Sequence, residues 1–254
     1  MKYLLRVALA AALVLGVSYS VAAQGEIVLV TPADMKPSLD DLLPRIEKKM
    51  GQKVKPIYGS VGATRKQVLS DDPFDVAVVM LPDAALLASG KLVVGSATPL
   101  ANVSVGVAVR HGAPKPDIST PEAVKRTLLA AKSLSYSDPA GGSAAGASFT
   151  ATLNQLGIAA QVQPKAKLSK AGADSLAVVA QGDAEIGLIF MSEMDEPGID
   201  VVGPLPKEIS PPNRFVGFIS AHAKDPAAAT ALLAALSSPE AAPAYKAHAM
   251  EPSH

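Results

Sequence analysis

The hydrophobic positions of the chain follow two alternating spacings. Continuous apolar runs at 26–32 (EIVLVTP) and 74–80 (FDVAVVM) predict strands that are buried on both faces. After the first run, apolar residues recur at the spacing of one face of a helix: Leu39, Leu42, Leu43, Ile46 and Met50. Because buried strands alternate with amphipathic helices, the pattern predicts a parallel sheet that helices cover on both sides.

The same two spacings predict elements along most of the chain. We expect strands at 26–32, 53–59, 74–80, 103–110, 133–137, 161–168, 184–191 and 216–221. We expect helices at 39–50, 62–69, 121–131, 144–156, 172–181 and 226–236. For the first helix, Ser38 is the expected N-cap, Gly51 is the expected end, and Pro44 predicts a late start or a kink.

The alternation of strands and helices restarts after the strand at 103–110, which predicts two lobes with a cleft between them. The expected division is a first lobe at 24–104, a second lobe at 105–204, and a C-terminal segment at 205–254 that returns to the first lobe. The predicted fold class is therefore α/β, built from two α/β lobes.

The first residues have the pattern of a targeting segment. Lys2 and Arg6 flank the start of an apolar run, and small residues occupy the −3 and −1 positions of a cleavage site that ends at Ala23. These features predict a signal peptide at residues 1–23, cleaved after about Ala23. A secreted chain without cysteine is typical of a bacterial periplasm, so we expect a periplasmic protein.

The composition excludes several classes of function. The 254 residues carry 23 basic and 23 acidic side chains, so there is no basic field for nucleic acid. Without cysteine there is no thiolate metal site and no cysteine nucleophile. The four histidines lack metal-ligand spacing, and we expect neither a metal nor a cofactor. The acidic residues Glu193, Asp195 and Glu196 are interpreted as solvated loop charges.

A glycine-rich turn at 135–149 (SYSDPAGGSAAGASF) precedes a predicted helix. Such a turn leaves backbone N–H groups unpaired and suits an anion, with Ser143 as a further ligand. Ligands of open α/β folds bind beyond the carboxyl ends of the strands. Four segments lie there, and each is alternatively an ordinary strand-to-helix turn: 32–36, 59–65, 138–146 and 190–193. We expect these segments to line the cleft.

Three longer stretches carry a resemblance to a known family: YGSVGATRKQVLSDDPFDVAVV, YSDPAGGSAAGASFTATLNQLGI and LAVVAQGDAEIGLIFMSEM. They resemble the molybdate-binding-protein-like branch of the periplasmic solute-binding proteins, over almost the whole chain beyond the signal segment. The resemblance implies the type II periplasmic-binding-protein fold, with two lobes that close on an anion. It also implies a monomer that delivers its ligand to an ABC-type permease in the inner membrane.

The resemblance transfers the family's ligand positions to this chain one by one. They fall on the residues Asp34, Val61 with the adjacent Ser60, Ala145, Gly172 and Phe190. Asp34 and Val61 stand where molybdate binders have serines, and Phe190 stands where they have a tyrosine. Each missing hydrogen bond to a charged ligand costs about 1.5–3 kcal/mol, and a carboxylate at position 34 repels a dianion.

Cationic side chains near these positions change the expected ligand. The candidates are Lys36, Arg65 and Lys66, and an arginine fork matches a carboxylate in bidentate fashion. The sequence therefore predicts a small di- or tricarboxylate rather than molybdate. The alternatives are that Arg65 faces solvent at the start of its helix and that Asp34 caps the next helix.

Two functions remain open from the sequence. The favoured one is a periplasmic receptor that captures a small carboxylate anion for an ABC-type transporter. The alternative is an enzyme, because the same branch resembles periplasmic aconitate isomerase, which moves a proton along an allylic tricarboxylate without a cofactor. In that case Asp34, in a cleft lined by Arg65 and Lys36, is the expected base, because burial raises the pKa of a carboxyl toward neutrality.

Overall fold

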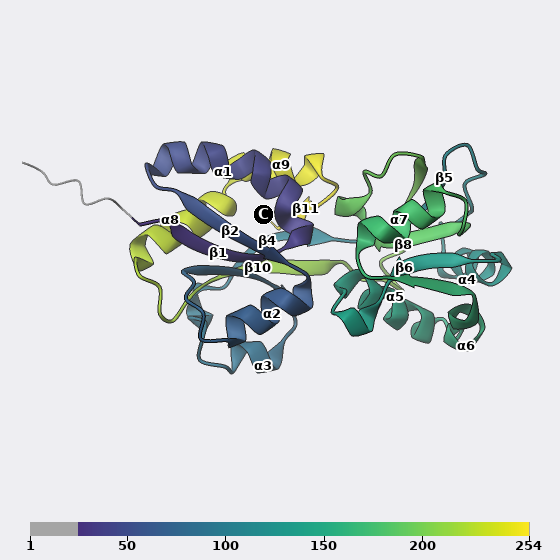
Figure 1. Ribbon diagram of the computed structural model, residues 1–254, viewed down its shortest axis with the longest axis horizontal. Coiled ribbons are helices and arrows are strands. Elements are labelled where there is room, and N and C mark those ends of the chain that lie inside the picture. Colours follow the sequence, from purple (N-terminus) through teal and green to yellow (C-terminus); the bar gives the residue numbers. More distant parts are fainter. Residues whose placement is uncertain (1–24, 254) are drawn as a thin grey trace, which may run out of the picture.

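The computed structural model describes residues 25–253 as two lobes that lie side by side, each built on its own sheet (Figure 1). The signal peptide expected at residues 1–23 lies outside the described residues. None of the helices between residues 25 and 253 is long and apolar enough to cross a membrane.

The first lobe contains a six-stranded sheet in the order β11-β4-β10-β3-β1-β2. Its strands are β1 (Ile27–Pro32), β2 (Val54–Gly59), β3 (Val76–Leu81), β4 (Thr98–Val103), β10 (Asn213–Ile219) and β11 (Glu251–Pro252). β1 pairs in parallel with β2 and β3, whereas β10 runs antiparallel to β3 and β4. The apolar run of β1 is buried on both faces, as its continuous hydrophobicity predicts.

Helices cover both faces of this sheet. They are α1 (Lys36–Met50), α2 (Val61–Leu69), α3 (Ala84–Leu87), α8 (Pro226–Leu236) and α9 (Ala242–Ala247), with short 3₁₀ helices η1 (Ala33–Met35), η2 (Val94–Ser96) and η6 (Pro239–Ala241). α1 packs against α8 and α9 on one side, and α2 and α3 lie on the other (Figure 1). α1 starts at Lys36 with Met35 as N-cap and runs through Pro44, so the predicted cap at Ser38 is wrong, whereas Gly51 ends the helix as predicted.

The second lobe contains a five-stranded sheet in the order β7-β6-β8-β5-β9. Its elements are β5 (Val105–Arg110), α4 (Pro121–Ala130), β6 (Leu134–Ser137), η3 (Pro139–Gly141), α5 (Ala144–Gln155), α6 (Ala159–Val162), η4 (Gln163–Lys165), β7 (Ala166–Ser169), α7 (Gly172–Ala180), β8 (Ile186–Phe190), η5 (Met191–Glu193) and β9 (Ile199–Pro204). β6 pairs in parallel with β7 and β8, and β5 is antiparallel to β8 and β9. Both sheets are therefore mixed, not purely parallel as the pattern predicts.

The chain crosses between the lobes twice. β4 ends at Val103 and β5 starts at Val105, and the return path leads from β9 through residues 205–212 into β10. The second crossing is attached to α5, since the Thr152 hydroxyl donates a hydrogen bond of 3.0 Å to the Ile209 carbonyl. This arrangement confirms the predicted α/β fold of two lobes.

One predicted strand is misplaced, and three strands were not predicted: β4, β9 and β11. Residues 161–168 form the end of α6, then η4 and the first three residues of β7. Ile158 and Val162 are both buried, and their four-residue spacing is that of a helix face, which the short stretch of alternating residues concealed. β4 was missed because Pro99 and the polar residues Thr98 and Asn102 interrupt its apolar positions.

Candidate functional site

The lobes touch where two glycine-rich turns meet. The Gly62 N–H, at the start of α2, donates a hydrogen bond of 3.2 Å to the Gly142 carbonyl in the turn before α5. A Cβ added to Gly62 would lie 3.0 Å from the Gly142 Cα, and Gly142 has a φ of +88°. Both positions therefore require glycine, and the segments 59–65 and 138–146 face each other across the junction.

The serines predicted as ligands cap the helices at this junction. The Ser60 hydroxyl accepts a hydrogen bond of 3.1 Å from the Ala63 N–H and caps α2. The Ser143 hydroxyl accepts one of 3.1 Å from the Gly146 N–H, caps α5, and lies 2.5 Å from the Ser137 hydroxyl. Each of these hydrogen bonds satisfies one of the free N–H groups in the first turn of its helix. Val61 and Ala145 occupy the first turns of these helices.

Asp34 follows β1 in the short helix η1 and is buried, with 8% of its surface exposed. It does not cap α1, whose N-cap is Met35 without a side-chain hydrogen bond, so the capping alternative is wrong. Burial raises the pKa of Asp34 to about 6, while hydrogen bonds from its own backbone N–H and with Glu193 lower it. Asp34 therefore titrates close to neutral pH.

Glu193 reaches Asp34 from the other lobe. It ends η5, directly after β8, and η5 packs against η1, the short helix that carries Asp34. Burial, the Asp34 charge and the nearby Asp195 raise the pKa of Glu193 to about 8. The negative charge of Asp34 therefore disfavours a second negative charge on Glu193. The interpretation of Glu193 as a solvated loop charge is wrong.

Gly172 makes room for the Glu193 carboxyl. It is the first residue of α7 and is buried, and a Cβ added to it would lie 2.9 Å from Glu193 Oε2. The N-cap residue Ala171 has no side-chain oxygen to cap the helix. The structure thus brings Asp34 and Gly172, both predicted from the sequence, to the same carboxyl group of Glu193.

Two of the predicted cations have partners within the first lobe. Lys36 Nζ lies 2.5 Å from Asp40 Oδ2, and the side chains of both residues are 53% exposed. Arg65 Nε lies 2.6 Å from Asp83 Oδ2. The described contacts therefore bring neither cation to Asp34, in contrast to the expected cleft.

Phe190 is fully buried at the end of β8 and belongs to the hydrophobic core. Two buried hydroxyl groups near the junction, Thr64 Oγ1 in α2 and Ser192 Oγ in η5, have no hydrogen-bond partner among the described residues. Buried hydroxyls without a partner are rare in proteins, and they are available as donors to a ligand. Both lie in segments expected to line the cleft, 59–65 and 190–193, but neither was named as a ligand, because single hydroxyl residues in a turn carry little signal.

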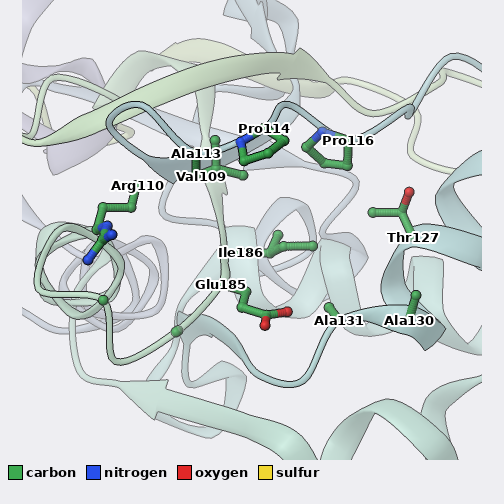
Figure 2. A pocket seen from close by; sticks show the side chains of 12 residues that line it. Val109, Arg110, Ala113, Pro114, Pro116, Thr127, Ala130, Ala131, Glu185 and Ile186 are labelled. Carbon is green, nitrogen blue, oxygen red and sulfur yellow. The ribbon is translucent and has the colours of Figure 1, made fainter.

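A separate groove of about 620 Å³ lies in the second lobe (Figure 2). Arg110, Glu185 and Ile186 contribute to its lining, and none of the predicted site residues does. Among residues 25–253, no three histidine, aspartate or glutamate side chains gather as metal ligands.

Residues 27–251 match the model of a protein family described as bacterial extracellular solute-binding protein. The chain belongs to this family. An aconitate isomerase from Pseudomonas sp. is 34% identical to this solute-binding protein over 224 residues, which cover 85% of this chain and 83% of the isomerase.

Solved structures support the same fold for this family member. The substrate-binding domain of a putative molybdenum ABC transporter from Clostridium difficile is 16% identical, with a TM-score of 0.74 over 90% of this chain and 99% of that one. The periplasmic molybdate-binding protein of Azotobacter vinelandii is 19% identical, with a TM-score of 0.70 over 89% of this chain and 98% of that one. At these identities the likeness establishes the fold, and it confirms the predicted two-lobed periplasmic-binding-protein architecture.

Proposed function

We propose that the chain binds a small di- or tricarboxylate anion between its lobes and moves a proton along an allylic acid, as a cofactor-free isomerase. The observation that carries this proposal is the burial of the Asp34 carboxyl in η1, which packs against η5 of the other lobe, because this burial raises the pKa of Asp34 to about 6. A receptor that only holds an anion gains nothing from a buried carboxyl pair, whereas a proton-transfer site requires a group that titrates near neutral pH.

The preference for carboxylates rests on the donors that the junction offers. Asp34, Val61 and Phe190 supply no hydroxyl donors, and Phe190 is enclosed in the core. A tetrahedral oxyanion would leave several oxygens unpaired beside a carboxylate, at about 1.5–3 kcal/mol for each missing bond. The backbone N–H groups of the helix N-termini and the hydroxyls of Thr64 and Ser192 suit the more separated charges of a carboxylic acid.

The proposed reaction is an allylic proton shift. The Asp34 carboxylate takes a proton from the methylene carbon of the bound acid, and the electron pair of the broken C–H bond spreads over the allylic carbons and the adjacent carboxylate. The protonated Asp34 then gives its proton to the far carbon, the double bond moves by one position, and Asp34 returns to its ionised form. The shift is balanced without an oxidant, a reductant or a cofactor. Burial raises the pKa of Asp34 to about 6, and a general base works best when its pKa lies near the working pH.

The relative with the name aconitate isomerase supports this proposal, since it is 34% identical over 85% of the chain. The second candidate is the receptor that the sequence favours, which would hand its ligand to an ABC-type permease. Family membership and the transporter named among the fold neighbours support that candidate. Both candidates place the mature chain in the periplasm as a monomer, after loss of residues 1–23.

Proton NMR of trans-aconitate in D₂O separates the two candidates. We expect the wild-type protein to exchange the methylene protons of the ligand and to form cis-aconitate. Asp34→Asn should slow this exchange by about 10²–10⁴-fold, the usual contribution of a general base, and should leave binding intact. Asp183→Asn, an exposed carboxylate in the loop after α7, is the matched control and should exchange like the wild type. Wild-type protein that binds trans-aconitate without exchange would establish the receptor.

A further inference from the structure

We propose that the groove of the second lobe is a further binding site, which takes an α-amino acid with an apolar side chain. The groove has a volume of about 620 Å³ and is lined by the end of β5, the end of α4 and the residues around the start of β8 (Figure 2). β5 starts at Val105, beside the crossing between the lobes, and reaches the groove at Arg110. The groove thus lies at the far end of this strand from the crossing, and the site is independent of the proposed function.

Two side chains of opposite charge border the groove. Arg110 ends β5 and Glu185 directly precedes β8, and because these strands pair antiparallel, both residues lie at the same end of neighbouring strands. Within residues 25–253 neither of them forms an ion pair. The Arg110 guanidinium lies against Gly182, where an added Cβ would be 3.0 Å from Nη1. Glu185 Oε2 accepts a hydrogen bond of 2.8 Å from the Lys132 N–H. Both side chains are therefore positioned at the groove with unpaired charges.

The walls of the groove are held in place by the rest of the lobe. The loop at 111–116 is attached to β9, since the Gly112 N–H donates a hydrogen bond of 2.9 Å to Asp200 Oδ2. At the end of α4, Lys165 Nζ donates a hydrogen bond of 2.6 Å to the Ala131 carbonyl. A groove with fixed walls exists before the ligand arrives, so binding loses little free energy to ordering of the protein.

The lining between these walls is apolar. Pro114 and Pro116 lie on one side, Ala130 and Ala131 lie on the other, and Ile186 lies between them (Figure 2). The volume falls within the range of small-molecule sites, which combine an apolar lining with a few polar groups that orient the ligand.

The charges and the lining together define the class of ligand. The Arg110 fork matches a carboxylate, and the Glu185 carboxylate accepts hydrogen bonds from an ammonium group. A simple anion would be repelled by Glu185, and a simple amine would be repelled by Arg110. The ligand that fits is a zwitterion whose two charges are adjacent and whose remainder is apolar, which is the form of an apolar α-amino acid.

Calorimetry and amide NMR spectra with L-leucine test the proposal. We expect saturable binding to the wild-type protein, with shifted amide signals in the segments 110–116 and 182–186. Leucinamide lacks the carboxylate and N-acetylleucine lacks the ammonium group, so each should bind about tenfold more weakly. Tricarballylate, a tricarboxylate without a double bond that the allylic shift cannot convert, is the probe for the junction between the lobes and should not displace leucine.

Four variants test the residues of the groove. Arg110→Gln should weaken leucine about tenfold without weakening leucinamide, and Glu185→Gln should weaken leucine about tenfold without weakening N-acetylleucine. Ala130→Leu keeps a good helix former in α4 but fills the groove, and it should abolish binding. Arg126→Gln changes an exposed arginine of α4 outside the groove and should bind leucine like the wild type.

Several outcomes would overturn the site. They are the absence of saturable leucine binding, equal affinities for leucine and its two analogues, and displacement of leucine by tricarballylate, which would place leucine in the junction. Binding of the dipeptide leucyl-leucine without binding of leucine would overturn the ligand class, because the groove would then take a peptide.

Discussion

At the residue scale, the junction differs from an ordinary oxyanion site through the carboxyl groups of Asp34 and Glu193. Asp34 could be predicted from the sequence because it follows a buried strand at a position that the family resemblance marks. Glu193 could not, since its role depends on the packing of η5 against η1 and on a glycine in α7. The only signal was its membership of the segment 190–193, which was expected to line the cleft.

The carboxyl pair predicts how the stability of the ligand-free protein depends on pH. Both pKa values are raised above those of the unfolded chain, so the folded state binds more protons between about pH 4 and about pH 8. The contribution of the pair is therefore fully present below about pH 4 and is lost as the pH rises through the folded-state values. The wild type should unfold more easily at pH 8 than at pH 5.

Asp34→Asn removes one titrating carboxyl group. It also removes the negative charge that raises the pKa of Glu193. We expect this variant to lose less stability between pH 5 and pH 8 than the wild type, by on the order of 1–3 kcal/mol. Urea unfolding at the two pH values measures the difference, with Asp183→Asn as an exposed control that keeps the wild-type loss. An equal loss in the wild type and Asp34→Asn would show that the pair does not control stability.

At the element scale, strand-to-helix turns rather than the strands themselves form the junction. Most strands and helices could be predicted, because each has a clear hydrophobic period and several have capping residues. The failures lie where proline and polar residues interrupt a strand, as in β4, or where a short helix and a short strand occupy one predicted strand, as at 161–168. The contact of Gly62 with Gly142 depends on the arrangement of the lobes and has no local signal.

That contact gives a prediction with a matched control. A methyl group on Gly62 would lie 3.0 Å from backbone, and one on Gly142 would also force a left-handed residue at φ +88°. We expect Gly62→Ala and Gly142→Ala to hold the lobes apart and to weaken tricarballylate binding about tenfold, or about 1.4 kcal/mol. Gly141→Ala meets nothing within 4 Å and should bind like the wild type. Calorimetry and small-angle scattering measure both effects, and unchanged affinity in all three variants would contradict the closed junction.

At the scale of the whole molecule, the two crossings let the lobes approach each other while each keeps its own sheet. Asp34 and Glu193 belong to different lobes, and the helices that carry them, η1 and η5, pack against each other where the lobes meet. The proposed proton transfer therefore takes place at the contact between the lobes. The two-lobed fold was predictable because the α/β pattern restarts, but the pairing of carboxyl groups across the junction needed the three-dimensional arrangement.

The most direct test of the account is a calorimetric comparison of tricarballylate with molybdate on the wild-type protein at about pH 7. The Asp34 carboxylate repels a dianion, and Val61 and Phe190 supply no hydroxyl donor, so we predict saturable binding of tricarballylate and no measurable binding of molybdate. Sub-micromolar molybdate binding, with tricarballylate unbound, would show that backbone N–H groups alone make an oxyanion site here and would contradict the account.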